Sequence, residues 1–285
     1  MGRTLWGKTS SEACTVFDNR LGSCPGDAAS VGRGTLGSGQ AEGHAMCGRF
    51  VVSQKVTDLT DVFDAEDDFP DWQPSFSIAP TEVVPIVRER ADRETGEFTR
   101  RVEPAVWNFR PSFMKESKRP QFNSRIETVA TNGLWKGAFA QGRCIVPMRG
   151  YYEWTGEPGS KRAHYLHGPA ELLAAAGIST ARKLDDGSWQ VSTSIITREA
   201  KDASGEIHDR MPVYLPLDEV DHYLDPVKLD AGAMQAMVGW LLDVSDRVAA
   251  TITEYEVDPR VNNSRRVDPG DPTLIEPIDA ADSSS

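Results

Sequence analysis

Cys47 is the residue with the most distinctive chemistry in this sequence, because it follows a methionine and precedes a glycine in the stretch MCGRF (46–50). A methionine before a small residue is typical of an initiator methionine that is removed, which would leave Cys47 as a chain terminus. Its α-amine would then have a pKa of about 7.7–8.0 and be unprotonated far more often than a lysine amine at pH 7. Such an amine forms an imine with an aldehyde, and the neighbouring thiol can close a thiazolidine ring. An internal Cys47 has only an amide nitrogen and would be one more small buried residue in a strand.

Two further residues are suited to moving protons near neutral pH. Glu153 lies between aromatic residues in GYYEW, and desolvation beside aromatic walls raises the pKa of a carboxyl group. His208 lies in EIHDRMP, a polar stretch that enters a short strand, and imidazole is the side chain best matched to proton transfer at pH 7. The simpler alternatives are a strand-edge Glu153 that points into solvent and a His208 that is an ordinary surface residue.

A third segment, FNSRIET, offers groups that could bind a sugar and a phosphate. Asn123 and Arg125 are two residues apart, so in a strand they point to the same face. An amide beside a guanidinium suits a sugar hydroxyl and a phosphate. The alternative is an ordinary strand in which Arg125 pairs with Glu127.

The charge of the chain is unevenly distributed. The 285 residues carry a formal net charge of −12, which by itself argues against a nucleic-acid partner. Residues 88–162, however, hold 15 basic and 9 acidic residues. This segment could form a local basic surface, or its excess could be no more than a solvated face.

Composition also limits the class of protein. No run of eighteen apolar residues and no secretory signal pattern is present, so the sequence predicts a cytoplasmic protein without a membrane partner. The four cysteines are too scattered for a disulfide framework and lack the spacing of a structural zinc site. We expect reduced thiols, no metal, no cofactor and a monomer.

The elements that must position these residues are mostly short strands. β-Branched and aromatic runs bounded by Gly, Pro and Asp predict strands in CGRFVVS, VVPIVRE, FTRRVEPAVWNF, RCIVPMRGYYEW, ELLAAAGI, WQVSTSIIT, PVYL and ATITEYEV. Helices are expected at about 55–64, 132–140, 217–224 and 230–242. Strands do not alternate with long helices, so a doubly wound sheet is disfavoured. The pattern predicts an α+β fold: a single β-rich domain with a mainly antiparallel, barrel-like core and a few flanking helices.

The two ends of the chain differ from this domain in composition. Residues 1–45 are rich in Gly and Ser with little apolar periodicity, which indicates a disordered or mis-assigned extension. Residues 279–285 have the composition of a disordered tail. The domain is therefore expected to span 46–278.

Taken together and in order, these motifs resemble those of the SOS response-associated peptidase family, the abasic-site-processing proteins. The resemblance runs from Met46 to about Ile278. It rests on MCGRF, SIAP, NSRIET (where the family usually has Asn-Ala-Arg-x-Glu-Thr), RCIVP, GYYEW, SIIT, IHDRMP and RVNN.

The resemblance implies a specific reaction. In the family the mature protein begins with the cysteine, whose amine attacks the ring-opened aldehyde of an abasic deoxyribose and whose thiol then closes a thiazolidine. It implies that Cys47 is the nucleophile and Glu153 the proton shuttle. His208 would assist ring opening and Schiff-base formation, and Asn123 would orient the sugar.

The resemblance also implies contacts to single-stranded DNA, and with them association with the nucleoid during repair. Arg49 and Arg125 would contact phosphates, while Pro80 and the Phe113–Met114 pair would be the apolar residues inserted beside the lesion. Relatives commonly have two tryptophans at that pair, so stacking on a base should be weaker here. The WNFRP run places Arg110 as an additional cation near the DNA.

Residues 1–45 match nothing in the family and would hold the Cys47 nitrogen in a peptide bond. Either translation starts at Met46 and the methionine is removed, which we favour, or the chain cuts itself between Met46 and Cys47. The same Cys, Glu and His could support that cut through an N-to-S acyl shift, and a strand-cleaving lyase reaction is a further expected side activity.

The expected function is therefore a DNA-repair protein that senses abasic sites in single-stranded DNA and crosslinks to them through Cys47. Its rivals are a cysteine or N-terminal-nucleophile peptidase that acts on proteins, and a noncovalent binder of modified bases. If Arg49, Arg110 and Arg125 do not converge beside Cys47, the DNA hypothesis loses electrostatic support.

Overall fold

The computed structural model describes residues 47–91, 95–114, 119–157 and 159–278. The expected extension, Met46 and the expected tail lie outside the described residues. Among the described residues, no helix is long and apolar enough to cross a membrane. Within the same ranges, no group of three or more His, Cys, Asp or Glu side chains is placed to hold a metal ion.

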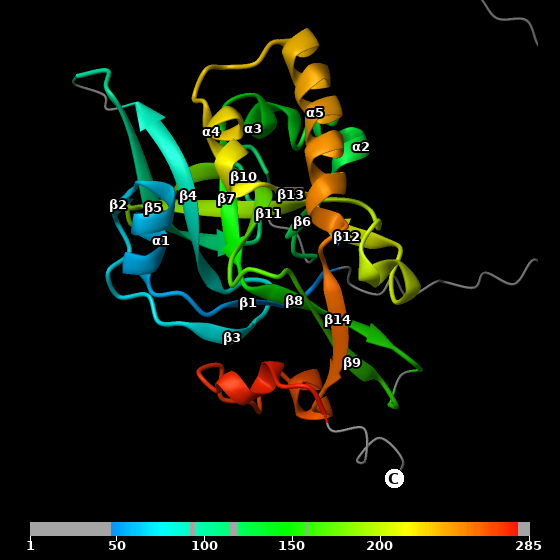
Figure 1. Cartoon of the computed structure of the whole chain (residues 1–285). Helices are drawn as coiled ribbons and strands as arrows, with labels where there is room; N and C mark the ends of the chain where they lie inside the picture. Colours follow the sequence, from blue (N-terminus) through cyan, green and yellow to red (C-terminus); the bar gives the residue numbers. More distant parts are fainter. Residues whose placement is uncertain (1–46, 92–94, 115–118, 158, 279–285) are drawn as a thin grey trace, which may run out of the picture. The chain divides into compact units, whose positions relative to one another are not determined.

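The core is a closed barrel of five strands, in the order β11, β10, β7, β4, β5 and back to β11 (Figure 1). Neighbouring strands run antiparallel except at the closure, where β5 and β11 run parallel. The predicted mainly antiparallel, barrel-like α+β fold is thus confirmed. The five strands are β4 (Val83–Ala91), β5 (Phe98–Trp107), β7 (Arg143–Met148), β10 (Leu173–Lys183) and β11 (Trp189–Glu199).

Close packing explains the small residues of β10, whose sequence LAAAG is unusual for a strand. Ala174, Ala175 and Ala176 are buried, and a Cβ added at Gly177 would lie only 3.0 Å from both the Cys144 sulfur and a methyl group of Val146. β10 contacts β7, β11 and the short strand β13 (Tyr214–Leu215) at once. Small side chains are therefore required where three strands converge on it.

A second sheet has five strands in the order β14, β9, β8, β1 and β3. It contains Glu153 on β8, and its strand β1 begins three residues after Cys47. Its pairs are all antiparallel. Figure 1 shows this sheet below the barrel, with β14 continuing directly from the long helix α5. The strands are β1 (Phe50–Val52), β3 (Ser75–Ile78), β8 (Gly150–Thr155), β9 (Arg162–His167) and β14 (Thr253–Val257).

Three short strands extend the barrel sheet. β6 (Asn123–Arg125) lies parallel to β11 just beyond the residues that pair with β5, and β12 (Arg210–Pro212) lies antiparallel to β11. β2 (Glu66–Asp67) pairs with β5 at the other edge. The segments of Asn123 and Arg210 are thereby both held on β11.

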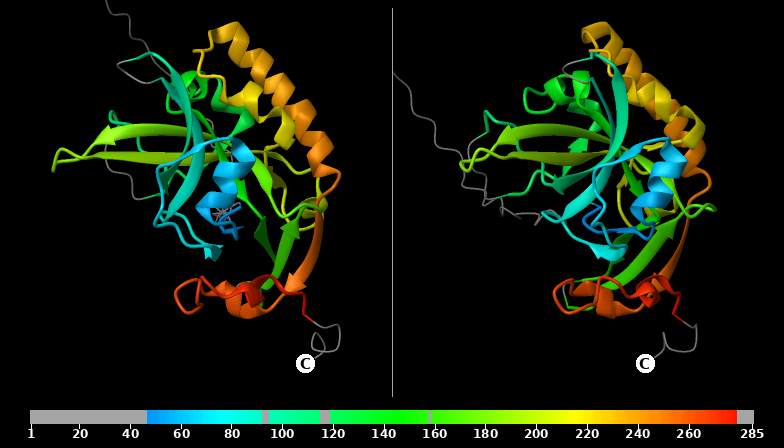
Figure 2. Two further views of the ribbon diagram at one scale, coloured as in Figure 1. Left: turned by 60° about the vertical axis from the view of Figure 1, so that its left-hand side comes forward. Right: turned by 90° about the vertical axis from the view of Figure 1, so that its left-hand side faces the viewer.

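The helices flank the barrel, as the views of Figure 2 show. They are α1 (Val56–Phe63), α2 (Ile126–Val129), α3 (Lys136–Gln141), α4 (Val220–Leu224) and α5 (Ala231–Ala249), with 3-10 turns η1 (Ala203–Glu206), η2 (Leu217–Glu219), η3 (Pro259–Asn262) and η4 (Pro272–Ile275). α5 begins at the expected point because the Asp230 side chain accepts from the Ala233 N–H at 2.8 Å. It extends seven residues beyond the predicted end, since Val244 and Ala249 continue its buried face.

Candidate functional site

Strand pairing brings Cys47 next to Glu153. β1 pairs antiparallel with β8 so that Phe50 faces Tyr151, and the Tyr152 N–H donates to the Arg49 carbonyl at 2.9 Å. Continuing this register places the residues just before β1 opposite Glu153. The Cys47 N–H donates to Glu153 Oε1 at 2.8 Å across 106 residues of sequence.

Glu153 is buried, with 2% of its surface exposed. Burial raises the pKa of the Glu153 carboxyl to about 7, while its hydrogen bonds with Cys47 oppose the shift and the negative charges of Asp202 and Asp209 add to it. A carboxyl group that titrates near pH 7 can both accept and donate a proton under physiological conditions.

The Cys47 thiol points into the protein interior and not into solvent. Its Sγ lies 3.8 Å from the Arg210 carbonyl oxygen, to which the thiol can donate. Burial, and then the nearby Glu153 charge, raises the pKa of the thiol well above its ordinary value. The thiol is therefore protonated at rest and needs a neighbouring base before it can act as a nucleophile.

The backbone of Cys47 is strained. Its φ of 43° lies in the left-handed region, which costs a residue with a Cβ about 1 kcal/mol or more. This torsion is defined by the bond to residue 46. In a chain whose first residue is Cys47, the torsion and its cost no longer exist.

His208 lies two residues before Arg210, whose carbonyl oxygen contacts the Cys47 thiol. Its Nδ1 accepts from the Arg210 backbone N–H at 3.1 Å, an arrangement that leaves the proton of a neutral ring on Nε2. Asp209 Oδ1 lies 3.0 Å from the same Nδ1 and would stabilise the ring when it is protonated. The imidazole is thus placed to exchange a proton while its backbone neighbours hold its orientation.

An ion pair holds the His208–Arg210 segment in place. Arg210 donates from Nη1 and Nη2 to the two carboxylate oxygens of Glu127, at 2.6 and 3.0 Å, and from Nη2 to the Thr197 carbonyl at 2.7 Å. Burial opposes ionisation of Glu127, but the hydrogen bonds and charge of Arg210 outweigh it and lower the pKa of that carboxyl. Glu127 therefore pairs with Arg210 and not with its neighbour Arg125, the alternative that the sequence left open.

We expect Glu127→Gln to lower the reaction rate at this site about tenfold. The ion pair that fixes Arg210 would be lost, and with it the position of the Arg210 carbonyl and the His208 ring. Its free energy of unfolding should fall by about 1–3 kcal/mol, measured by urea denaturation, as one charge-assisted pair is lost. Thr128→Ala, at the adjacent exposed position, is the control and should change neither quantity. An unaltered rate in Glu127→Gln would show that the ion pair does not position the site.

A cavity of about 250 Å³ opens beside Glu153. Its lining residues come from the β1 start, the β8–β9 hairpin, the loop before β12 and η3: Gly48, Arg49, Glu153, Trp154, Lys161, His208 and Asn262. The volume is large enough for a sugar with an attached phosphate. Glu153 and His208, drawn together from distant segments, thus share one small pocket.

The three predicted arginines do not converge. Arg49 lines the cavity, whereas Arg110 and Arg125 are absent from its lining. Arg125 is exposed on β6, and Arg110 is half-buried with its backbone N–H bonded to Ser192 Oγ at 2.9 Å. The electrostatic support expected from these three residues is therefore limited to Arg49 at this cavity.

The other predicted site residues lie around the barrel edge. Asn123, half-buried, faces Ile195 of β11, the strand whose Thr197 carbonyl binds Arg210. Pro80 is half-buried in the turn that precedes β4. Neither residue lines the cavity beside Glu153.

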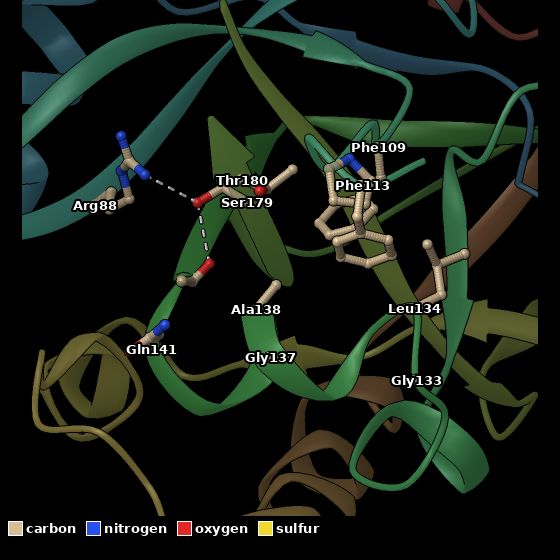
Figure 3. A pocket seen from close by; sticks show the side chains of 12 residues that line it. Arg88, Phe109, Phe113, Gly133, Leu134, Gly137, Ala138, Gln141, Ser179 and Thr180 are labelled. Atoms are coloured by element: carbon tan, nitrogen blue, oxygen red, sulfur yellow. Dashed lines mark hydrogen bonds between the residues drawn. The ribbon is translucent and has the colours of Figure 1, made fainter. Parts of the chain in front are cut away.

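Phe113 and Met114 follow β5. Phe113 is 70% exposed, and it lines a separate cavity of about 340 Å³ together with Phe109, Leu134 and Ala138 (Figure 3). Met114 is half-buried. An exposed aromatic ring is compatible with stacking on a base, but Phe113 lies at a different cavity from that of Glu153.

Sequence reasoning missed several residues of the site. Lys161 and Asn262 line the cavity, and Asp202 accepts from the buried Tyr151 hydroxyl at 2.8 Å close to the thiol. Asn262 lies in RVNN, one of the motifs of the resemblance, to which the sequence assigned no role. Nothing in the local sequence marks Lys161 or Asp202, because each acquires its place only through tertiary contacts.

Comparisons with known proteins agree on one family. A family model described as SOS response associated peptidase (SRAP) matches residues 46–264. The abasic site processing protein YoaM of Bacillus subtilis is 26% identical over 230 residues, which cover 78% of this chain and 98% of that protein. The abasic site processing protein YedK of Escherichia coli is 30% identical over 178 residues, covering 60% of this chain and 75% of that protein. The abasic site processing protein HMCES of Gallus gallus is 26% identical over 235 residues, covering 70% and 68%.

Solved structures share the fold. A crystal structure of a Bacteroides thetaiotaomicron protein superimposes with a TM-score of 0.66 at 20% identity, covering 81% of this chain and all of that one. A Bordetella bronchiseptica protein superimposes with a TM-score of 0.57 at 17% identity, covering 74% of this chain and all of that one. At these identities the likeness concerns the architecture alone.

Proposed function

The chain belongs to the SOS response associated peptidase family, and we propose that it repairs DNA by capturing abasic sites in single-stranded DNA as a covalent thiazolidine crosslink to Cys47. The observation that carries the proposal is the 2.8 Å contact between the Cys47 nitrogen and the Glu153 carboxyl at the edge of a sugar-sized cavity. Relatives named as abasic site processing proteins support the choice of substrate.

The active form is proposed to begin at Cys47. The family match starts at residue 46, and the backbone strain at Cys47 disappears when residue 46 is removed. The backbone nitrogen that now donates to Glu153 would then be the α-amine, already held beside a carboxyl group. A free α-amine in model peptides is partly neutral at pH 7, and the adjacent Glu153 carboxylate can take the proton of the remainder before the nitrogen attacks an aldehyde.

In the first step, the neutral amine adds to C1′ of the ring-opened deoxyribose, and the carbinolamine loses water to give an imine. Glu153 takes a proton from the nitrogen, and either Glu153 or His208 returns one to the departing hydroxyl. Asn123 is proposed to orient the sugar. Arg49 and Arg125 are proposed to contact phosphates, with Arg110, Pro80, Phe113 and Met114 along the path of the strand.

In the second step, the thiol closes the ring. Its proton passes to Glu153 and on to the imine nitrogen while sulfur bonds to C1′, so no atoms are gained or lost. The Arg210 carbonyl holds the thiol 3.8 Å away beforehand, which limits its motion and favours ring closure. The reverse sequence would release the DNA. Removal of a C2′ proton from the imine by a base, with departure of the 3′ phosphate, would give the strand-cleaving side reaction.

The basic test is crosslinking of the protein that begins at Cys47. Incubation with an oligonucleotide containing one abasic site should give an adduct that survives heating in SDS and migrates more slowly on a gel. The same site within a duplex should react more slowly, because a paired, stacked strand must first be deformed to enter the cavity. Failure of the single-stranded oligonucleotide to form any adduct would rule the proposal out.

The family name suggests a second use of the same groups, which we propose as a self-processing step. The Cys47 thiol would attack the carbonyl of residue 46, the Cys47 nitrogen would leave as an amine protonated by Glu153, and water would hydrolyse the resulting thioester. The strained φ of Cys47 favours breaking this bond. Intact mass of the protein isolated from its own cells would show whether the chain begins at Met1, Met46 or Cys47.

A further inference from the structure

We propose that Lys161 and Arg49 together clamp the phosphate next to the abasic sugar, and that Asn262 sets the position of Lys161. The inference rests on the proposed function and assigns to Lys161 a phosphate-binding role. It also supplies a second cation at a cavity that only Arg49 of the three predicted arginines lines.

Arg49 has a buried donor without a hydrogen-bond partner among the described residues. Its Nη1 donates to Ser77 Oγ at 2.9 Å and to the Val261 carbonyl at 3.1 Å. Its Nε is buried and has no hydrogen-bond partner among the described residues, although the side chain lines the cavity and only 8% of the residue is exposed. A buried guanidinium N–H without a partner is costly, and a phosphate oxygen would satisfy it.

Asn262, which also lines the cavity, links two of its other lining residues. Its Oδ1 accepts from Trp154 Nε1 at 2.7 Å, and its Nδ2 donates to the Lys161 carbonyl at 3.0 Å. The Trp154 ring in turn lies 5.8 Å from the Arg49 guanidinium carbon. The Asn262 side chain thereby links the backbone of Lys161 to Trp154, whose ring lies beside Arg49.

The Lys161 amine forms no ion pair among the described residues. Within the described ranges no carboxylate lies within ion-pair distance of its amine, whereas the next residue, Arg162, is paired with Glu256 at 2.8 Å. Glu153 lines the same cavity but is bonded to the Cys47 nitrogen. A cation without a protein partner beside an unsatisfied guanidinium N–H is the donor set that a phosphodiester requires.

The clamp can be tested by noncovalent binding to a single-stranded oligonucleotide with a tetrahydrofuran abasic analogue, which cannot open to an aldehyde. Lys161→Gln should weaken binding about tenfold at low salt, because a charge-assisted contact is lost. The slope of log affinity against log salt should become shallower by about 0.7, the value for one phosphate contact on a single strand. Lys161→Arg should restore both.

Arg162→Gln is the matched control, since it removes the same charge one residue away from a side chain already paired with Glu256. It should leave affinity and slope nearly unchanged. An equal loss in both variants would mean that Lys161 acts only through general electrostatics, and the clamp would be wrong.

Replacing single flanking phosphates by methylphosphonates locates the contact. At one position, loss of the phosphate charge should make wild type and Lys161→Gln bind alike, whereas at the others the tenfold difference should persist. Additive effects at every position would overturn the proposal, as would failure of the wild-type protein to bind the analogue. Crosslinking of a natural abasic site by the same protein would show that the proposed function stands even if the clamp fails.

Discussion

Cys47→Ser, in a protein that begins at residue 47, should lose the heat-stable crosslink to abasic DNA, with a reduction on the order of a hundredfold or more. The variant keeps an α-amine beside Glu153, so an imine can still form. It lacks a thiol to close the ring, and a hydroxyl is a poorer nucleophile that gives a less stable ring. Borohydride reduction should therefore trap an adduct in the variant, although heating without reduction should release the DNA.

A chain that retains residues 1–46 and does not process itself should behave differently. Its Cys47 nitrogen is an amide that cannot form an imine, so borohydride should trap no adduct at residue 47 in that form. Mass spectrometry of the trapped peptide identifies the attached residue. A Cys47→Ser protein that still gives the heat-stable adduct, or an adduct mapped to a lysine in the wild type, would contradict the assignment of Cys47.

The fold could be predicted largely from local pattern. Strands such as VVPIVRE and WQVSTSIIT are long enough and β-branched enough to be recognised alone. Prediction failed where partners determine the structure. RAHYLH becomes β9 because it lies between β8 and β14, and PVYL is split between two strands because Pro212 pairs with β11 while Leu215 pairs with β10.

The proximity of three candidate site residues followed from choosing residues by their chemistry. Cys47, Glu153 and His208 were selected from their motifs, and the structure places the latter two in one cavity and the first in hydrogen-bond contact with Glu153. Arg125 and Arg110 were selected as cations in the FNSRIET and WNFRP segments, and a segment alone does not reveal where a side chain lies on a barrel. Lys161 was missed for the converse reason: its position depends on Asn262, 101 residues later.

Glu153→Gln should both disable the site and stabilise the fold at alkaline pH. A glutamine can still accept the Cys47 N–H but cannot carry protons, so crosslinking should slow about 100-fold or more. Because burial raises the pKa of Glu153 to about 7, the ionised carboxylate is disfavoured in the native state. Between pH 4.5 and 7 the native protein holds a proton that the unfolded chain has lost, so stability falls as pH rises through this window.

The difference of about 2.5 pH units corresponds to about 3 kcal/mol above pH 7, which the glutamine variant should recover. Denaturation of wild type and Glu153→Gln should thus give similar unfolding free energies near pH 4 and a more stable variant at pH 8. Glu97→Gln, at an exposed position, retains Glu153 and serves as the control, so its unfolding free energy should follow that of wild type at both pH values. If the variant were destabilised at pH 8, the buried carboxyl would be held by contacts that favour its charge, and a role as a proton carrier near neutrality would have to be abandoned.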